Sequence, residues 1–348
     1  MRVFAACFAW VLISRAVWAA EPEQAGEPLK IERPKANSAE EPVAKEFSRG
    51  KGAEFLDAAS LTWTRERKCG TCHTNYPHLM ASSAIPECRP EARREVRAFF
   101  EGRIRDWDQT DKPRGETELV ATAFALAFDD AQTTKTLHPM TRKALDKMWE
   151  LQNSSSGAWN WEKCNWPPLE HDDFLGATYA ALAVGYAPEN YAASDGAQEG
   201  LKRLRRFFWA NRPPDLHHKG MFLWASRKLD GLMNAEEQAA IVKELFAAQR
   251  PDGGWSLPML GGWKRRDGTV NDAAGLSDGY ATGLVTYVLR QSGVPANDER
   301  LQRAVVWLKA NQRQSGRWFT RSLNTDRAHY MSHVGSAYAL MAIQACAE

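Results

Sequence analysis

The chain has 348 residues, enough for one large domain or two ordinary ones. Its apolar fraction of 44% and charged fraction of 25% are ordinary, and a net charge of +2 argues against a polyanionic partner such as a nucleic acid. Fourteen tryptophans are unusual, and they indicate a tryptophan that recurs at a structural position.

Residues 1–20 have the pattern of a secretory signal peptide, with Arg2 before an apolar core and a small-residue cleavage site near Ala19. A retained anchor is the alternative, although the core is too short to span a bilayer. We therefore expect export to the periplasm or beyond, where disulfides form and bacterial c-type haem is attached. Residues 21–50 lack an apolar period, so we expect a flexible linker there and a folded domain over 51–348.

The domain begins with a helical pattern over 55–63, followed by Cys69-Gly70-Thr71-Cys72-His73. The spacing C-x-x-C-H is typical of covalent c-type haem attachment, in which two cysteines form thioethers and His73 ligates the iron. A local disulfide and a zinc site that recruits Cys88 are the alternatives. For a sixth iron ligand the candidates are His171, Met331 and His333.

Six short apolar segments with a capping residue recur along the chain, as expected for helices buried on all sides. They begin at Thr74, Thr117, Asp173, Ser226, Asp278 and Ser332, and the fourth is a poor match.

Amphipathic segments alternate with the apolar ones, at 90–107, 139–152, 196–210, 235–248 and 298–312. Three of them end in a Gln followed by Gly-x-Trp, with the tryptophans at 159, 255 and 318. The Gln side chain can bond backbone carbonyls left unpaired at the helix end, and the Gly allows a left-handed turn. The Trp side chain fills the junction with the next helix pair. We predict an all-α fold, a single α/α toroid of six helical hairpins whose inner helices gather their N-termini at one mouth.

The Gln-Gly-x-Trp motif resembles the repeat of squalene-hopene cyclases, oxidosqualene cyclases and prenyltransferase β-subunits over residues 51–347. More narrowly, the chain is similar to secreted bacterial squalene-cyclase-like proteins that carry C-x-x-C-H-T in the first repeat. Triterpene cyclases have two helical domains, whereas this chain has one ring. Their D-x-D-D acid motif resembles Glu170-His171-Asp172-Asp173 here, with Glu in place of the first Asp, and this resemblance implies Asp172 as proton donor. A prenyltransferase zinc site is not expected, because the Asp278-x-Tyr280 segment lacks the cysteine.

Each candidate residue also has a structural explanation. Asp173 and Asp278 are good helix caps, and Asp172 favours the helix dipole, so acid catalysis by any of the three competes with capping. His171 and His333 suit capping loops.

After removal of the signal, Cys88, Cys164 and Cys346 remain outside the C-x-x-C-H motif, and the sequence does not choose a disulfide pair among them. The aromatics Tyr179, Tyr280, Tyr287 and Tyr338 are expected in the core.

Three functions remain open at this point. The first is a haem-bearing toroid that binds an apolar, isoprenoid-like molecule and has a redox role, with a redox partner protein and a peripheral membrane contact. The second is a small terpenoid cyclase with Asp172 as general acid. The third is a non-catalytic binding module of the cell envelope.

Overall fold

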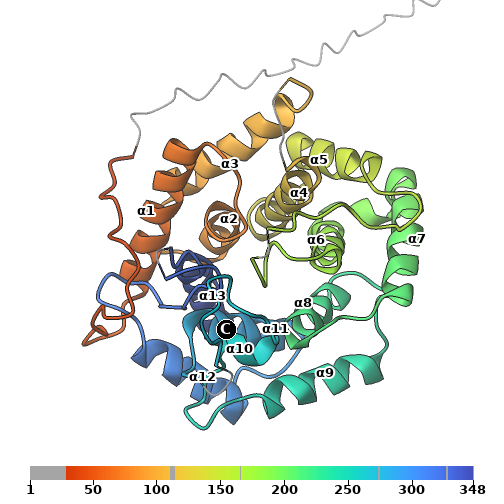
Figure 1. The fold of residues 1–348 in the computed structure, drawn as a ribbon. Coiled ribbons are helices and arrows are strands. Elements are labelled where there is room, and N and C mark those ends of the chain that lie inside the picture. The colour runs from red at the N-terminus through yellow and green to blue at the C-terminus, as the bar shows by residue number, and fades with distance from the viewer. Residues whose placement is uncertain (1–28, 110–113, 165, 273–274, 327, 348) are drawn as a thin grey trace, which may run out of the picture. The chain divides into compact units, whose positions relative to one another are not determined.

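Six helical hairpins follow one another around a ring in the computed structural model (Figure 1). It describes residues 29–109, 114–164, 166–272, 275–326 and 328–347. The predicted signal peptide lies outside these residues, as does the linker up to residue 28. Residues 31–348 form a single unit, and the description below concerns this unit.

The inner ring consists of the apolar helices α2 (Asn75–Ala84), α4 (Gly115–Gln132), α6 (Asp173–Tyr186), α8 (Leu216–Ser226), α11 (Gly279–Gln291) and α13 (Met331–Ala345). Each packs against the next, and α13 returns to α2, so the ring is closed. The outer ring consists of α1 (Arg49–Arg67), α3 (Pro90–Arg105), α5 (Pro139–Glu150), α7 (Asp195–Ala210), α9 (Ala235–Ala247) and α12 (Glu299–Ala310). A 3₁₀ turn, η1 (Tyr191–Ala193), and the short α10 (Leu257–Leu260) complete the helices of the described residues. The predicted all-α toroid of six hairpins is confirmed.

The Gln-Gly-x-Trp motifs join the two rings as the sequence predicts. The indole N–H of Trp318 donates to Leu308 O at 2.7 Å, and the amide of Gln312 donates to Gly316 O at 2.9 Å. Trp159 and Trp255 donate in the same way to Met148 O and Leu245 O. Gly316 has φ +93°, and a Cβ there would lie 2.1 Å from Lys51 O, so the turn requires glycine.

The fourth inner helix lies elsewhere than the sequence pattern predicts. Ser226 is the last residue of α8 rather than its first, and the helix is capped by Asp215, whose carboxylate accepts from His218 N at 3.0 Å. Two histidines and a lysine occupy the first turn of α8, and these polar residues conceal the apolar pattern.

Smaller corrections concern three other caps. Asp172, not Asp173, caps α6 by accepting from Leu175 N. Thr117 lies inside α4, where its hydroxyl accepts from Glu162 N at 2.7 Å. Ser332 lies inside α13, and its hydroxyl accepts from Thr320 N at 3.0 Å. Asp278 caps α11 as predicted.

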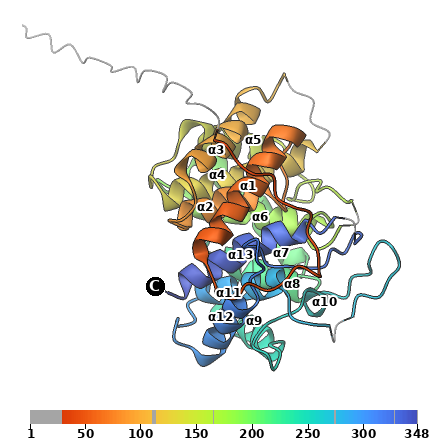
Figure 2. The same ribbon diagram turned by 90° about the vertical axis from the view of Figure 1, so that its left-hand side faces the viewer.

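Part of the predicted linker belongs to the folded unit. Ser48 caps α1, Ala44 N donates to Gln312 O at 2.7 Å, and the guanidinium of Arg317 pairs with Glu41. In the side view of Figure 2 this red segment runs along the blue C-terminal hairpin. The boundary predicted near residue 51 is therefore too late, because residues 37–48 help to join the first repeat to the last.

Aromatic side chains fill the centre of the ring at the level of Trp224. This side chain is fully buried, and its ring contacts Phe124, Tyr287 and Tyr338 at centroid distances of 5.7, 5.2 and 6.5 Å. The four tyrosines predicted to lie in the core are between 1% and 6% exposed. The interior at this level is thus occupied by the chain's own side chains.

Candidate functional site

The C-x-x-C-H motif forms the loop between α1 and α2. Asn75, the first residue of α2, fixes its shape: the side-chain oxygen accepts from Thr71 N at 2.8 Å, and the amide donates to Cys69 O at 3.0 Å. A Cβ on Gly70 would lie 2.1 Å from the Tyr76 hydroxyl, so this position has room only for glycine. The motif is therefore held in one conformation by the helix that follows it.

His73 is buried and neutral. Its Nδ1 lies 2.8 Å from the Thr74 hydroxyl, which also lies 3.0 Å from Nδ1 of His333. Burial lowers the pKa of His73 well below its usual value. Because Nδ1 is occupied by Thr74, Nε2 is the ring nitrogen left for a ligand.

Three aromatic rings enclose His73. Tyr330 stacks on it at 5.0 Å, Trp63 meets it edge-on at 4.8 Å, and Trp166 lies at 5.3 Å. The indole nitrogens of Trp63 and Trp166 are buried and have no hydrogen-bond partner among the described residues. Buried N–H groups are normally paired, so these two are donors available to a group bound beside His73.

The two motif cysteines differ in exposure. Cys69 is half-buried, whereas Cys72 is 4% exposed. Burial raises the pKa of the Cys72 thiol well above its usual value. All five described cysteines, which also include Cys88, Cys164 and Cys346, are free thiols in this structure.

The candidate sixth ligands are placed differently. His333 has both ring nitrogens engaged, Nδ1 with Thr74 and Nε2 with Asn37 at 3.3 Å. Met331 is buried at the start of α13. His171 has a buried Nδ1 without a partner among the described residues, so it is the candidate with a free nitrogen.

The chemistry of this donor set fits a covalent haem. Two thiols precede a neutral imidazole whose Nδ1 is held by Thr74, and two indole N–H groups without a partner among the described residues border the imidazole. A hollow of about 270 Å³ lies beside them, lined by Trp63, Tyr330 and His333. Cys69, Cys72 and His73 are absent from its wall, so a bound macrocycle requires one of the covering rings to move.

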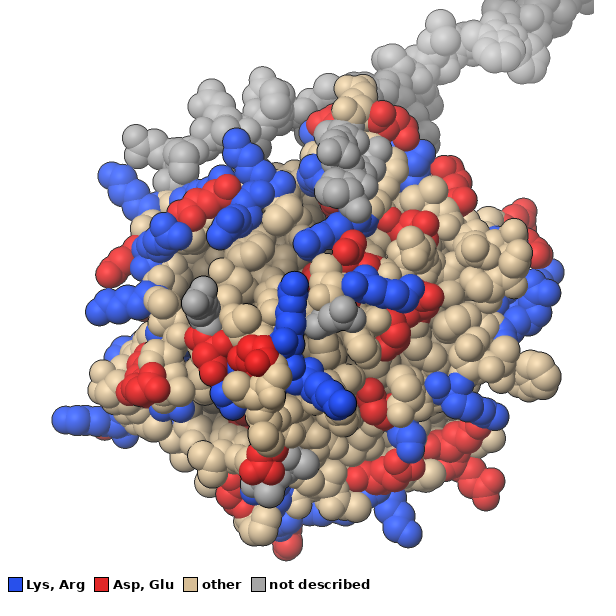
Figure 3. Space-filling model, in the orientation of Figure 1, with Lys and Arg blue, Asp and Glu red and all other residues tan. Residues whose placement is uncertain are grey.

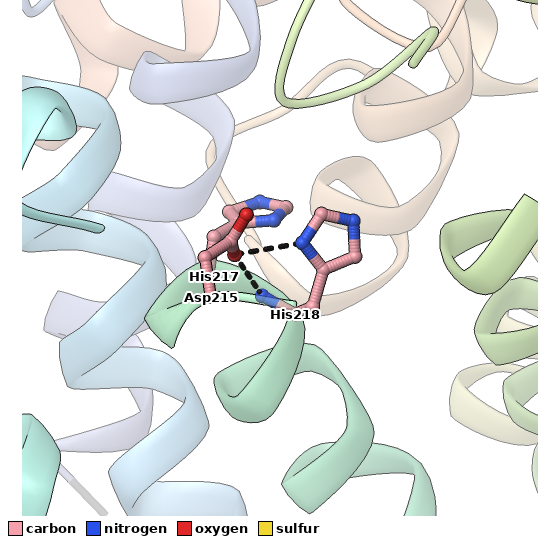
Figure 4. A group of neighbouring side chains, drawn as sticks. All are labelled: Asp215, His217 and His218. Carbon is pink, nitrogen blue, oxygen red and sulfur yellow. Dashed lines mark hydrogen bonds and ion pairs between the residues drawn. The ribbon is translucent and has the colours of Figure 1, made fainter. Parts of the chain in front are cut away.

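A second cluster lies where α6, α8 and α11 begin (Figure 4). Nδ1 of His218 lies 2.7 Å from Oδ1 of Asp215, and Nε2 lies 2.9 Å from Oδ2 of Asp172. The neighbouring His217 has Nε2 at 2.8 Å from the Tyr280 hydroxyl. Among the described residues, Asp215, His217 and His218 are the one group of three or more His, Cys, Asp or Glu whose ligand atoms lie within 4.8 Å of one another. The zinc site considered for Cys69, Cys72, His73 and Cys88 is therefore not assembled.

The cluster determines the charge of Asp172. Burial lowers the pKa of His218, but its contacts with Asp172 and Asp215 outweigh this effect and raise that pKa to about 9. Burial likewise raises the pKa of Asp172, but the contact with His218 outweighs it and lowers that pKa. Asp172 is consequently ionised at neutral pH, the opposite of what a proton donor needs.

The other two candidate acids are also engaged. Asp173 is 41% exposed and lies 2.6 Å from Nζ of Lys163. Burial raises the pKa of Asp278 to about 6, yet its carboxylate accepts hydrogen bonds from Ala281 N and the Thr320 hydroxyl. Each of the three carboxylates thus has its own partners, namely Lys163 for Asp173, His218 for Asp172 and Thr320 for Asp278.

The sequence alone did not point to Asp215, His217 and His218 as site residues, nor to Trp63 and Trp166. The first three had only a weak signal, an aspartate after Pro213-Pro214 that can cap a helix, because the polar residues after it conceal the apolar pattern of α8. The two tryptophans had none, because their neighbours come from segments distant in sequence.

The molecular surface offers no dominant charge on the face of Figure 3, where acidic and basic side chains are interspersed. No helix within the described part of the chain is both long enough and apolar enough to cross a membrane.

Comparison with known proteins gives the fold. No protein family matches the sequence, and no curated protein matches it. Among solved structures, ent-copalyl diphosphate synthase from Streptomyces platensis is similar with a TM-score of 0.54 and 13% identity, over 85% of this chain and 51% of that one. The chain thus spans about half the length of that synthase.

An α-1,6-mannanase from Salegentibacter is similar with a TM-score of 0.52 and 12% identity, over 85% of this chain and 99% of the mannanase. A glycosidase solved with glucose is similar with a TM-score of 0.54 and 11% identity, over 85% of this chain and 97% of the other. The chain therefore has an α/α toroid fold, which it shares with this synthase, this mannanase and this glycosidase.

Proposed function

We propose that the chain is an exported toroid protein that carries a c-type haem on Cys69 and Cys72, with His73 as iron ligand and a redox role. The observation that carries the proposal is the state of His73: a buried, neutral imidazole whose Nδ1 is held by Thr74 directly after a C-x-x-C pair. A histidine that binds iron needs this fixed orientation. A hydrogen bond at one ring nitrogen fixes the tautomer and leaves the other nitrogen to bind the metal.

The chain's own residues supply the surroundings. Thr74 orients His73, and Trp63, Trp166 and Tyr330 shield it from water. The unpaired indole N–H groups of Trp63 and Trp166 can donate to an anionic or carbonyl oxygen of the bound group. A haem bound there supplies one-electron chemistry.

The site would exchange electrons with a redox partner protein, and a small apolar, isoprenoid-like molecule is the ligand class that the resemblance of the repeat motif to squalene cyclases implies. Because aromatic side chains fill the ring at Trp224, we place such a ligand at the helix N-termini rather than deep in the centre.

A peripheral membrane contact has a candidate surface on α7 and α9. Trp209 is 81% exposed and borders a groove of about 570 Å³ together with Arg205, Arg212 and Lys219, of which Arg212 and Lys219 are paired with Glu237 and Glu244. Exposed tryptophan beside basic side chains suits an anionic bilayer surface. Sedimentation with anionic vesicles should fall for Trp209→Ala, and unchanged sedimentation would rule out this contact.

Absorption spectra test the haem proposal. The protein is exported from a host with haem-attachment machinery, as wild type, as Cys69→Ala/Cys72→Ala and as Cys88→Ala. We expect a Soret band that survives denaturation in wild type and Cys88→Ala but not in the double variant. A colourless wild-type protein from a competent host would overturn the proposal.

Acid catalysis by Asp172, as in a terpenoid cyclase, receives less support from the geometry. Its carboxylate is bound to His218 and caps α6, and both contacts favour the ionised form.

A further inference from the structure

We infer that Asp215, His217 and His218 form a binding site for a divalent transition-metal ion of the zinc class, separate from the C-x-x-C-H motif. The three residues come from the start of one helix, where the sequence Asp215-Leu216-His217-His218 places a carboxylate and two imidazoles on the first turn of α8. One ligand atom from each lies within 4.8 Å of the other two. Three nitrogen and oxygen ligands with an open fourth position are typical of exchangeable or catalytic zinc.

An unsatisfied atom points to the ion independently. His217 is 2% exposed, and its Nδ1 is buried without a hydrogen-bond partner among the described residues. Figure 4 shows its ring beside the Asp215 carboxylate. A buried imidazole nitrogen without a partner is uncommon, and a metal ion would satisfy it.

The outer nitrogen of each histidine is already held by a second residue. The Tyr280 hydroxyl lies 2.8 Å from Nε2 of His217, and Oδ2 of Asp172 lies 2.9 Å from Nε2 of His218. The contact between Asp172 and His218 is an ion pair and not a well-directed hydrogen bond. Metal-ligating histidines almost always have such a partner on their other nitrogen, which leaves both Nδ1 atoms for the ion.

Nδ1 of His218 lies 2.7 Å from Oδ1 of Asp215, so the two atoms that would bind the ion are joined by a hydrogen bond in this structure. The metal would displace the proton of this hydrogen bond, and Nδ1 of His218 and the Asp215 carboxylate would become ligands. An imidazolium between two carboxylates accounts for His218, but it leaves Nδ1 of His217 unpaired. The side chains of Asp215 and Asp172 are 16% and 27% exposed, so an ion can enter from their side.

Zinc retention tests the inference on the full exported protein. The chain is stripped with a chelator, reloaded with zinc alone, washed, and analysed for zinc and iron by mass spectrometry. The site variants are Asp215→Asn, which keeps an oxygen to cap α8, and His217→Gln. The control is His138→Gln, a histidine with a 46% exposed side chain that caps α5. Cys69→Ala/Cys72→Ala separates this site from the haem motif, because covalent haem iron resists the chelator.

We expect wild type, His138→Gln and the double cysteine variant to retain about one zinc per chain, and the two site variants to retain none. Tyr280→Phe removes only the oxygen behind His217, and it should weaken zinc binding by about tenfold or more. If Asp215→Asn or His217→Gln does not fold, the zinc affinity of Tyr280→Phe tests the inference instead. Equal zinc retention by wild type and His217→Gln, or loss of zinc in the cysteine variant alone, would overturn the inference.

Discussion

Nε2 of His218 lies 2.9 Å from Oδ2 of Asp172, so the residue that caps α6 also balances a buried imidazole of α8. The two helices are neighbours in the inner ring, and this contact joins them at their N-terminal ends. It explains why the residue that matches an acid motif in sequence has a structural role here.

Replacement of Asp172 should therefore cost stability. Asp172→Asn keeps an oxygen for the helix cap but removes the charge that faces His218, so we expect a loss of about 1–3 kcal/mol in the free energy of unfolding. Asp173→Asn is the matched control, because that side chain is exposed and its pair with Lys163 contributes less than about 1 kcal/mol. Urea denaturation of both variants measures the difference, and equal stability would contradict the role assigned to Asp172.

The hydroxyl of Thr74 serves two histidines. Thr74→Val leaves Nδ1 of His73 and Nδ1 of His333 without this partner in the protein interior, which should cost about 1–3 kcal/mol. Thr74→Ser keeps the hydroxyl and should stay close to wild type. Chemical denaturation compares them, and a stable valine variant would show that the hydroxyl does not hold the imidazoles.

A tryptophan of the repeat motif, such as Trp318, should contribute far more to the stability of the fold than the exposed Trp209. Trp318→Phe loses the hydrogen bond to Leu308 O and part of a fully buried ring, so we expect a loss of about 1–3 kcal/mol in the free energy of unfolding. Trp209→Phe changes a side chain that is 81% exposed and should leave stability unchanged. Thermal unfolding of the pair checks this order, and a reversed order would contradict the assigned role of the motif.

Asp278 should titrate near neutral pH. Burial raises its pKa to about 6, although hydrogen bonds from Ala281 N and Thr320 oppose the shift. Because the pKa in the folded state exceeds the unfolded value of about 3.9, the folded state binds this proton more tightly. The contribution of Asp278 to stability therefore improves as the pH falls from above 6 to below about 4. Carbon NMR of its carboxyl group measures the midpoint, and titration below pH 4 would contradict the prediction.

The repetitive part of this fold could be predicted from sequence, because each repeat carries its own local signals. The tryptophans at 159, 255 and 318 identify three junctions between outer and inner helices. Asp278 is correctly predicted to cap the helix that is α11 in the structure. The start of α8 could not be recognised in the same way, because His217 and His218 interrupt its apolar pattern.

The sites were only partly predictable for a physical reason. C-x-x-C-H is contiguous in sequence, whereas the partners of its histidine come from other elements, such as Trp166 and Tyr330. His217 and His218 acquire their chemistry from Tyr280 and Asp172, which lie on neighbouring helices. A single sequence shows a contiguous motif such as C-x-x-C-H, but it does not show contacts between residues on different helices.

The most direct test of the central claim is the intact mass of the exported chain under denaturing conditions. The account predicts a mass increased by one haem in wild type and in Cys88→Ala, and the unmodified mass in Cys69→Ala/Cys72→Ala. A wild-type chain of unmodified mass, from a host that attaches haem to a control cytochrome, would contradict it.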